Sequence, residues 1–189
     1  MGQKYNAKII SLVREPLSRR VSGLFQGIEA IEEIEPAPDF KSRLEAFQQK
    51  TYKHKEWKWF DKELKQVFGI DIYQHPFDKE AGYTIIKKDN ISLLLLTMER
   101  LNDLEEVIQK FIGDENFKLK NDNIGNEKAS AFAYKTFKER VSFSDEIIEE
   151  ELHNPYMRHF YTDEQIEKFY IYWKEKSDKN KGYKEYRFD

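Results

Sequence analysis

The stretch KIISLVREPLSRRVSGLF, residues 8–25, carries the change from strand to helix that decides the fold class. Its first part, KIISLV, predicts a strand that is apolar on both faces, which is typical of a sheet covered by helices on both sides. Pro16 suits the first turn of a helix, and Leu17 and Val21 begin an apolar face that would pack on the sheet. The stretch predicts an α/β protein with Arg14 at the carboxyl end of a buried strand.

The remaining sequence adds helices and two more strands. Residues 41–68 have a charged helical pattern with an apolar stripe, and Gly69 would end that helix. Strands are predicted at 82–88 and 91–98 around the turn-forming pair Asp89 and Asn90, and the more apolar second strand belongs in the centre of the sheet. Helices are predicted from Asn102 or Asp103 to Gly113, over 127–141 and 144–152, and from a capping box at 162–165. This order predicts a three-layer α/β sandwich with a small, mostly parallel sheet flanked by helices.

Composition limits the classes of function. The formal net charge of −3 gives no overall basic field, so we do not expect nucleic acid as a partner. The chain has no Cys, and its four His lack metal-ligand spacing, so neither a thiolate nucleophile nor a metal site is expected. The longest apolar run, ISLLLL, is too short to cross a membrane, which predicts a cytoplasmic location. We expect one domain over residues 1–176 and a flexible tail over 177–189.

Arg14 and Ser22 form a candidate anion site. A guanidinium at a strand end and a hydroxyl eight residues later on the next helix can donate to one phosphate, with Arg19 or Arg20 adding positive field. The alternative is that Arg14 pairs with Glu15 or another acid, and that Ser22 is a small residue where helix meets sheet. The residues alone favour this alternative, because isolated Arg and Ser pairs are common.

The order of residues in LVREPLSRRVSGLF resembles the sulfotransferase segment that holds the 3′-phosphate of the donor 3′-phosphoadenosine 5′-phosphosulfate (PAPS). There a strand ends in Arg, an acid-Pro turn follows, and a Ser lies eight residues after the Arg, as with Arg14, Glu15, Pro16 and Ser22 here. Residues 57–112 and 119–169, with the strand LLLLTMERLND, are similar to the sulfotransferase-like capsular polysaccharide synthesis family of bacteria. The resemblance covers about residues 8–173 and implies a P-loop sulfotransferase fold.

This sequence departs from sulfotransferases at its start. Those enzymes have, before the Arg-bearing strand, a Gly-rich loop with a cation that wraps the 5′-phosphosulfate. Only seven residues precede the strand here, and no such loop occurs later. We therefore expect an N-terminally truncated or degenerate relative, with half of the donor site absent and weak or no turnover.

The resemblance implies PAPS as the donor, with Arg14, Ser22 and Arg19 at its 3′-phosphate. The late loop LKNDNIGNEK would close over the donor through Asn123, Gly125 and Lys128. The alternative for this loop is a plain turn before a helix.

The sequence assigns no catalytic residue. A base for sulfuryl transfer would be a His or a carboxylate near the acceptor hydroxyl. His54 lies in a basic aromatic helix, His75 precedes Pro76, and Glu99 follows a central strand, but a structural role is at least as well supported for each.

The predicted function is transfer of a sulfuryl group from PAPS to a hydroxyl of a glycan or lipid-linked saccharide, if the upstream loop is supplied. The rival prediction is a non-catalytic interaction or scaffold module of capsule assembly that retains the fold. Either would allow peripheral association with the capsule machinery.

Overall fold

The computed structural model describes residues 6–23, 58–120, 138–139 and 141–180. The chain divides into two compact units, and each is described by itself. Unit 1 comprises Met1–Arg14, His54–Asn121 and Pro155–Asp163, and unit 2 comprises Glu15–Lys53, Asp122–Asn154 and Glu164–Asp189. The domain limits predicted from the sequence stay a prediction.

Unit 1 contains a small mixed sheet, built among the described residues from β1 (Ala7–Val13), β2 (Tyr83–Lys88) and β3 (Ile91–Thr97). The strand order is β1-β3-β2, so β3 is central, as its apolar sequence predicted. β1 pairs with β3 in parallel, from Ala7 opposite Ile91 to Val13 opposite Thr97. β2 and β3 form an antiparallel hairpin around the predicted turn, where Asp89 has a φ of 51°. Within the described strands the sheet is therefore mixed, and the prediction of a mostly parallel sheet is wrong.

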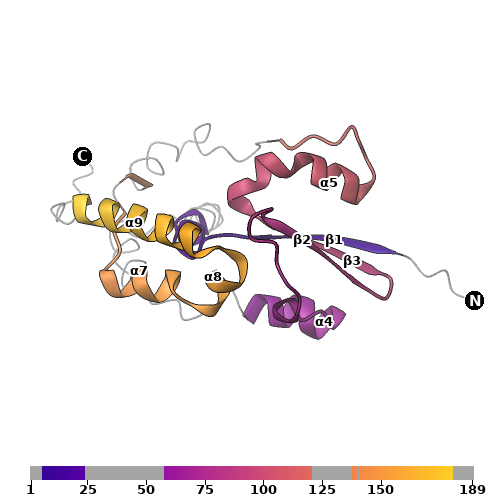
Figure 1. Cartoon of the computed structure of the whole chain (residues 1–189), viewed down its shortest axis with the longest axis horizontal. Helices are drawn as coiled ribbons and strands as arrows, with labels where there is room; N and C mark the ends of the chain where they lie inside the picture. Colours follow the sequence, from indigo (N-terminus) through magenta and orange to yellow (C-terminus); the bar gives the residue numbers. More distant parts are fainter. Residues whose placement is uncertain (1–5, 24–57, 121–137, 140, 181–189) are drawn as a thin grey trace, which may run out of the picture. The chain divides into compact units, whose positions relative to one another are not determined.

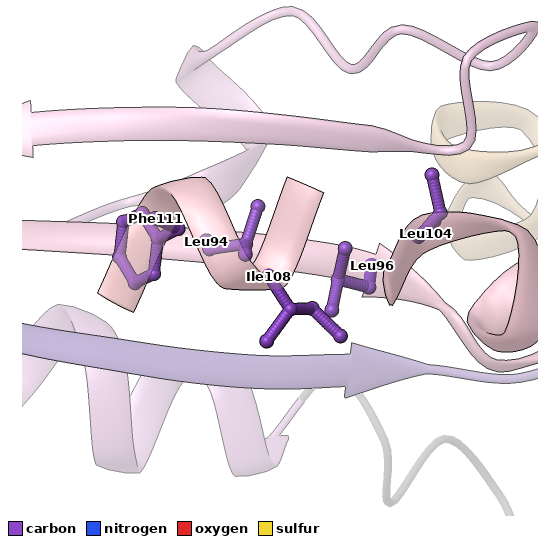
Figure 2. Packing of buried hydrophobic residues seen from close by; sticks show 5 residues of the cluster. All are labelled: Leu94, Leu96, Leu104, Ile108 and Phe111. Carbon is purple, nitrogen blue, oxygen red and sulfur yellow. The ribbon is translucent and has the colours of Figure 1, made fainter. Parts of the chain in front are cut away.

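Helices cover both faces of this sheet. After β3 the chain passes through the 3₁₀ turn η3 (Met98–Leu104) into α5 (Glu105–Ile112). Figure 2 shows Leu104, Ile108 and Phe111 packed on Leu94 and Leu96 of β3. The alternate residues Leu93 and Leu95 point to the other face and are equally buried. Figure 1 shows α4 (Gln66–Phe68), which continues the π-helical η1 (Phe60–Lys65), on the side of the sheet opposite α5.

β1 is less buried than its sequence predicted. Ile10 and Leu12 are 42% and 44% exposed, although their partners on β3, Leu94 and Leu96, are fully buried. The reason is position, because β1 is an edge strand among the described residues and α5 packs over β3. The prediction that β1 is covered on both faces is therefore wrong.

The helix ends in unit 1 agree with the sequence only in part. Gly69 and Gly113 end their helices with φ values of 66° and 81°, as predicted. The predicted N-cap at Asn102 or Asp103 is wrong, because α5 begins after Leu104, which makes no side-chain capping bond. The 3₁₀ turn η3 runs directly into α5, so no side-chain hydrogen bond from Leu104 caps the start of this helix.

An aromatic cluster joins three segments of unit 1. Phe60 of η1 stacks on Tyr156 of α8 (Pro155–Phe160), with ring centroids 6.2 Å apart. Phe160 packs edge-on against Phe77, and it also contacts Tyr73 of the 3₁₀ turn η2 (Ile72–Gln74). Such contacts contribute about 0.5–1.5 kcal/mol each beyond the area that they bury. The cluster fixes α8 to unit 1.

Unit 2 contains the helical residues 16–23, α7 (Asp145–Leu152) and most of α9 (Asp163–Asn180). Ser144 caps α7 by accepting a hydrogen bond from the Ile147 amide, which confirms the predicted start of that helix. Phe143 packs edge-on against Trp173 of α9, and its amide donates to the Ser177 hydroxyl at 3.0 Å. No helix formed by the described residues has the length and apolar character that crossing a bilayer requires.

Candidate anion-binding site

Arg14 follows β1 at the carboxyl edge of the sheet, and a buried tyrosine holds its peptide groups. The Tyr156 hydroxyl accepts a hydrogen bond from the Arg14 amide and donates one to the Arg14 carbonyl, both at 3.1 Å. Arg14 itself is half-buried. Tyr156 of α8, which is far from Arg14 in the sequence, thus fixes the direction in which the chain leaves β1.

A second tyrosine of the same segment reaches the end of β3. The Tyr161 hydroxyl donates to Oε2 of Glu99 at 2.9 Å. Glu99 lies two residues beyond Thr97, the last residue of β3, and Thr97 is paired in register with Val13. Because adjacent strands lie about 4.8 Å apart, the chain segments that carry Arg14 and Glu99 leave the sheet at neighbouring points of one edge.

Glu15 occupies the start of the helix that follows β1. Its two carboxylate oxygens accept hydrogen bonds from the amides of Leu17, at 2.7 Å, and Ser18, at 2.8 Å. Glu15 is fully buried, and this burial raises the pKa of its carboxyl group, while the hydrogen bonds from Ser18 and Leu17 act in the opposite direction. These two amides are the ones that would otherwise bind an anion at a helix N-terminus. An anion near this turn must therefore be held by side chains.

The other basic residues of the opening stretch have different environments. Arg19 is exposed and Ser22 is half-buried, both on the helix in unit 2. Arg20 is buried, and its Nη1 lies 3.2 Å from Oε1 of Glu151, with the guanidinium over the Phe143 ring. Arg20 is thus paired inside unit 2, and the suggestion that it adds field to an anion site stays a prediction. Arg14 belongs to unit 1 and Ser22 to unit 2, so the clamp that they would form stays a prediction.

The late-loop residues Asn123, Gly125 and Lys128 lie outside the described residues, as does His54. No three His, Cys, Asp or Glu side chains gather as metal ligands within the described ranges.

The structure describes His75, His153 and His159, and each of them contacts neighbouring groups of the protein. His159 packs edge-on against Tyr73 and Phe160. Burial lowers its pKa, with a further lowering from the nearby Lys79. The His153 Nδ1 lies 3.0 Å from Oε1 of Glu149, one turn earlier on α7. The His75 amide donates to the Ile72 carbonyl at the end of η2.

Tyr156 and Tyr161 were not found by sequence reasoning. Both lie in a short segment, NPYMRHFYTDEQ, whose local pattern gives only a helix start. Two tyrosines five residues apart, with Met157 and Phe160 between them, were the available signal, because a buried Tyr usually has a hydrogen-bond partner for its hydroxyl. The sequence does not indicate which backbone groups those partners are.

A comparison with protein families bears on the region that contains these tyrosines. Residues 39–162, about two thirds of the chain, match the model of the family NKWYS, described as "Putative capsular polysaccharide synthesis protein". The chain belongs to this family. The match to the capsular polysaccharide synthesis family includes Glu99, Tyr156 and Tyr161, and it begins after Arg14. No curated protein and no solved structure matches the chain.

Membership in the capsular polysaccharide synthesis family gives the chain a role in that pathway at the level of the family description. It does not specify the reaction or the sulfotransferase-like fold that the sequence resembles.

Proposed function

We propose that this capsular polysaccharide synthesis protein binds the nucleotide PAPS through Arg14 and takes part in sulfuryl transfer to a glycan hydroxyl. One observation carries the proposal, which is the fixed position of Arg14 at the carboxyl edge of a parallel strand pair. In α/β proteins, ligands bind at this edge of the sheet. A guanidinium whose backbone is already held there loses less conformational freedom when it binds a phosphate.

The capping of the helix by Glu15 supports a site made by side chains. With the Leu17 and Ser18 amides already bonded, a phosphate gains its hydrogen bonds from a guanidinium fork and from hydroxyl groups. Arg14 supplies the fork in this proposal, and Ser22 and Arg19 supply further donors. Asn123, Gly125 and Lys128 would cover the donor from the late loop.

The reaction would be an in-line transfer at sulfur. The acceptor hydroxyl oxygen forms a bond to sulfur, the bond from sulfur to the 5′-phosphate oxygen breaks, and the hydroxyl proton passes to a base. The products are the sulfate ester of the glycan and 3′-phosphoadenosine 5′-phosphate. The proposal assigns donor binding to Arg14 and leaves the groups that stabilise the moving sulfuryl group unassigned.

Calorimetry with 3′-phosphoadenosine 5′-phosphate tests the donor site. We expect Arg14→Ala to weaken binding by about tenfold or more, because a hydrogen bond to a charged group contributes roughly 1.5–3 kcal/mol. Arg14→Lys should recover only part of this loss, since an ammonium lacks the planar fork. Lys110→Ala is the matched control, because it removes one positive charge from a side chain of α5 that is 81% exposed.

A second ligand identifies the phosphate that Arg14 contacts. Adenosine 5′-phosphate lacks the 3′-phosphate, so wild type and Arg14→Ala should bind it equally. No measurable binding of 3′-phosphoadenosine 5′-phosphate by wild type, or equal binding by Arg14→Ala, would reject the proposal and favour the non-catalytic scaffold.

A further inference from the structure

Glu99 is an exposed carboxylate that is held by a buried side chain. It is exposed to solvent, yet its Oε2 accepts a hydrogen bond from Tyr161, a residue that is only 2% exposed. A buried phenol does not rotate freely, so the carboxylate that it holds has a defined orientation. Glu99 is thus preorganised at the carboxyl edge of the central strand, where α/β proteins bind ligands.

Two other held glutamates of the chain provide a comparison. Glu105 accepts hydrogen bonds from the Lys118 ammonium and the Leu119 amide, and its role is to fix the chain that follows α5. Glu15 is buried and caps a helix. In both cases backbone amides of the chain take up carboxylate oxygens, which accounts for the side chain structurally. Glu99 differs in that one of its partners is a side-chain hydroxyl and the residue is exposed.

The neighbour of Glu99 adds apolar surface. Met98 is 38% exposed, although it is a large apolar residue directly after β3. A carboxylate beside exposed apolar surface suits a sugar, because hydroxyl groups donate to the carboxylate while the C–H face of the ring covers apolar atoms. A carboxylate also repels a ligand of like charge, so this site favours neutral sugars over uronates.

We propose that Glu99, oriented by Tyr161, binds the hydroxyl groups of a neutral sugar, with Met98 beside it. In the proposed function this sugar belongs to the acceptor glycan, and that assignment rests on the proposed function. The sugar site itself does not, because it depends only on residues at the end of β3 and in the 155–163 segment. Both Glu99 and Tyr161 lie within the region that matches the capsular polysaccharide synthesis family.

Saturation-transfer NMR with defined probes tests the sugar site. The neutral probes are the methyl glycosides of glucose, galactose and N-acetylglucosamine, together with chitotetraose, and methyl glucuronide is the charged probe. We expect wild type to transfer saturation to at least one neutral probe and not to the glucuronide. Glu99→Ala should weaken the responding probe by about tenfold, as expected for the loss of a charge-assisted hydrogen bond.

Three further variants separate binding from folding. Glu99→Gln keeps the shape and should lose part of the affinity, and Tyr161→Phe should weaken binding because it releases the carboxylate. Glu106→Gln is the matched control, since the Glu106 side chain on α5 is 81% exposed and should leave binding unchanged. The melting temperature of each variant shows whether it is folded.

The results distinguish this inference from the donor proposal. If no neutral probe responds in wild type, or if folded Glu99→Ala and Glu99→Gln respond like wild type, the sugar site is refuted. If the probes require Glu99 while 3′-phosphoadenosine 5′-phosphate does not bind, the donor proposal fails and the sugar site stands. If no sugar probe responds while wild type and Glu99→Ala bind the nucleotide equally well, the sugar site fails and the donor proposal stands.

Discussion

Replacing Tyr156 by Phe removes one oxygen atom that makes two hydrogen bonds to the backbone of Arg14. The ring remains, so the contacts with Phe60 and Phe160 are kept. Each hydrogen bond contributes a net value of about 0.5–1.5 kcal/mol. The free energy that holds the end of β1 should therefore fall by about 1–3 kcal/mol.

Hydrogen exchange at the Arg14 amide measures this change where it occurs. A loss of about 1–3 kcal/mol corresponds to exchange that is faster by a factor of about 5–150. A melting temperature lower by a few degrees should accompany it, since about 1 kcal/mol shifts a chain of this size by roughly 2–4 °C. The amides of β2 should change less, because they pair with the other edge of β3.

Tyr172→Phe is the control for loss of a phenol oxygen. Tyr172 is 50% exposed on α9, and its hydroxyl accepts a hydrogen bond from Lys176. We expect this variant to differ from wild type by less than about 0.5 kcal/mol. If the Arg14 amide exchanges equally fast in Tyr156→Phe and in wild type, Tyr156 does not hold the strand end, and the argument for a preorganised Arg14 loses its basis.

Three further outcomes can be measured by urea or thermal unfolding. Gly82→Ala should lower the free energy of unfolding by at least about 1–2 kcal/mol, because Gly82 has a φ of 76° and an added Cβ would lie 2.8 Å from a neighbouring hydroxyl oxygen. Gly23→Ala, with open space and a helical backbone, should be neutral or stabilising. Equal effects of the two substitutions would contradict this reasoning. Arg20→Met and Glu151→Leu should each lower the free energy of unfolding by about 3–5 kcal/mol, because each leaves the partner's charge buried and unpaired. The double variant should lose less than the sum of the two. Additive losses would mean that the pair is not coupled. Burial places the pKa of His159 below its ordinary value, so the unfolded chain takes up a proton on this imidazole at a higher pH than the folded chain. Wild type should therefore lose stability relative to His159→Gln as the pH falls from about 7.5 to 5.5. A constant difference in stability between the two would contradict a lowered pKa for His159.

The sequence predicted those parts of the fold that depend on local signals. The apolar run of β3, the turn at Asp89, and the helix ends at Gly69 and Gly113 are each specified within a few residues, and the structure confirms them. The exposed side of β1 was not predictable in this way, because Ile10 and Leu12 have the apolar pattern of a central strand. Which strand lies at an edge is decided by tertiary pairing.

Of the hydrogen-bonded groups in the candidate site, only the strand-end positions of Arg14 and Glu99 were predictable from the sequence. Arg14 was placed at a strand end from the sequence, and β1 does end at Val13. The partners of this edge come from the 155–163 segment, and hydrogen bonds to a backbone that is distant in the sequence leave no periodic signal. Glu99 was recognised as a strand-end residue, but its bond to Tyr161 needed the structure.

The register of β3 also has a consequence for the order of folding. On one side Ile91 pairs with Lys88 across a two-residue turn, and on the other side it pairs with Ala7, near the start of the described sequence. Hairpins form in microseconds, whereas contacts that close long loops are slow. The β2 and β3 hairpin should therefore form before β1 adds to it. Arg14 then reaches the sheet edge only in a late step, after Glu99 is already in place on the hairpin strand, so a ligand that needs Arg14 selects molecules in which folding is complete.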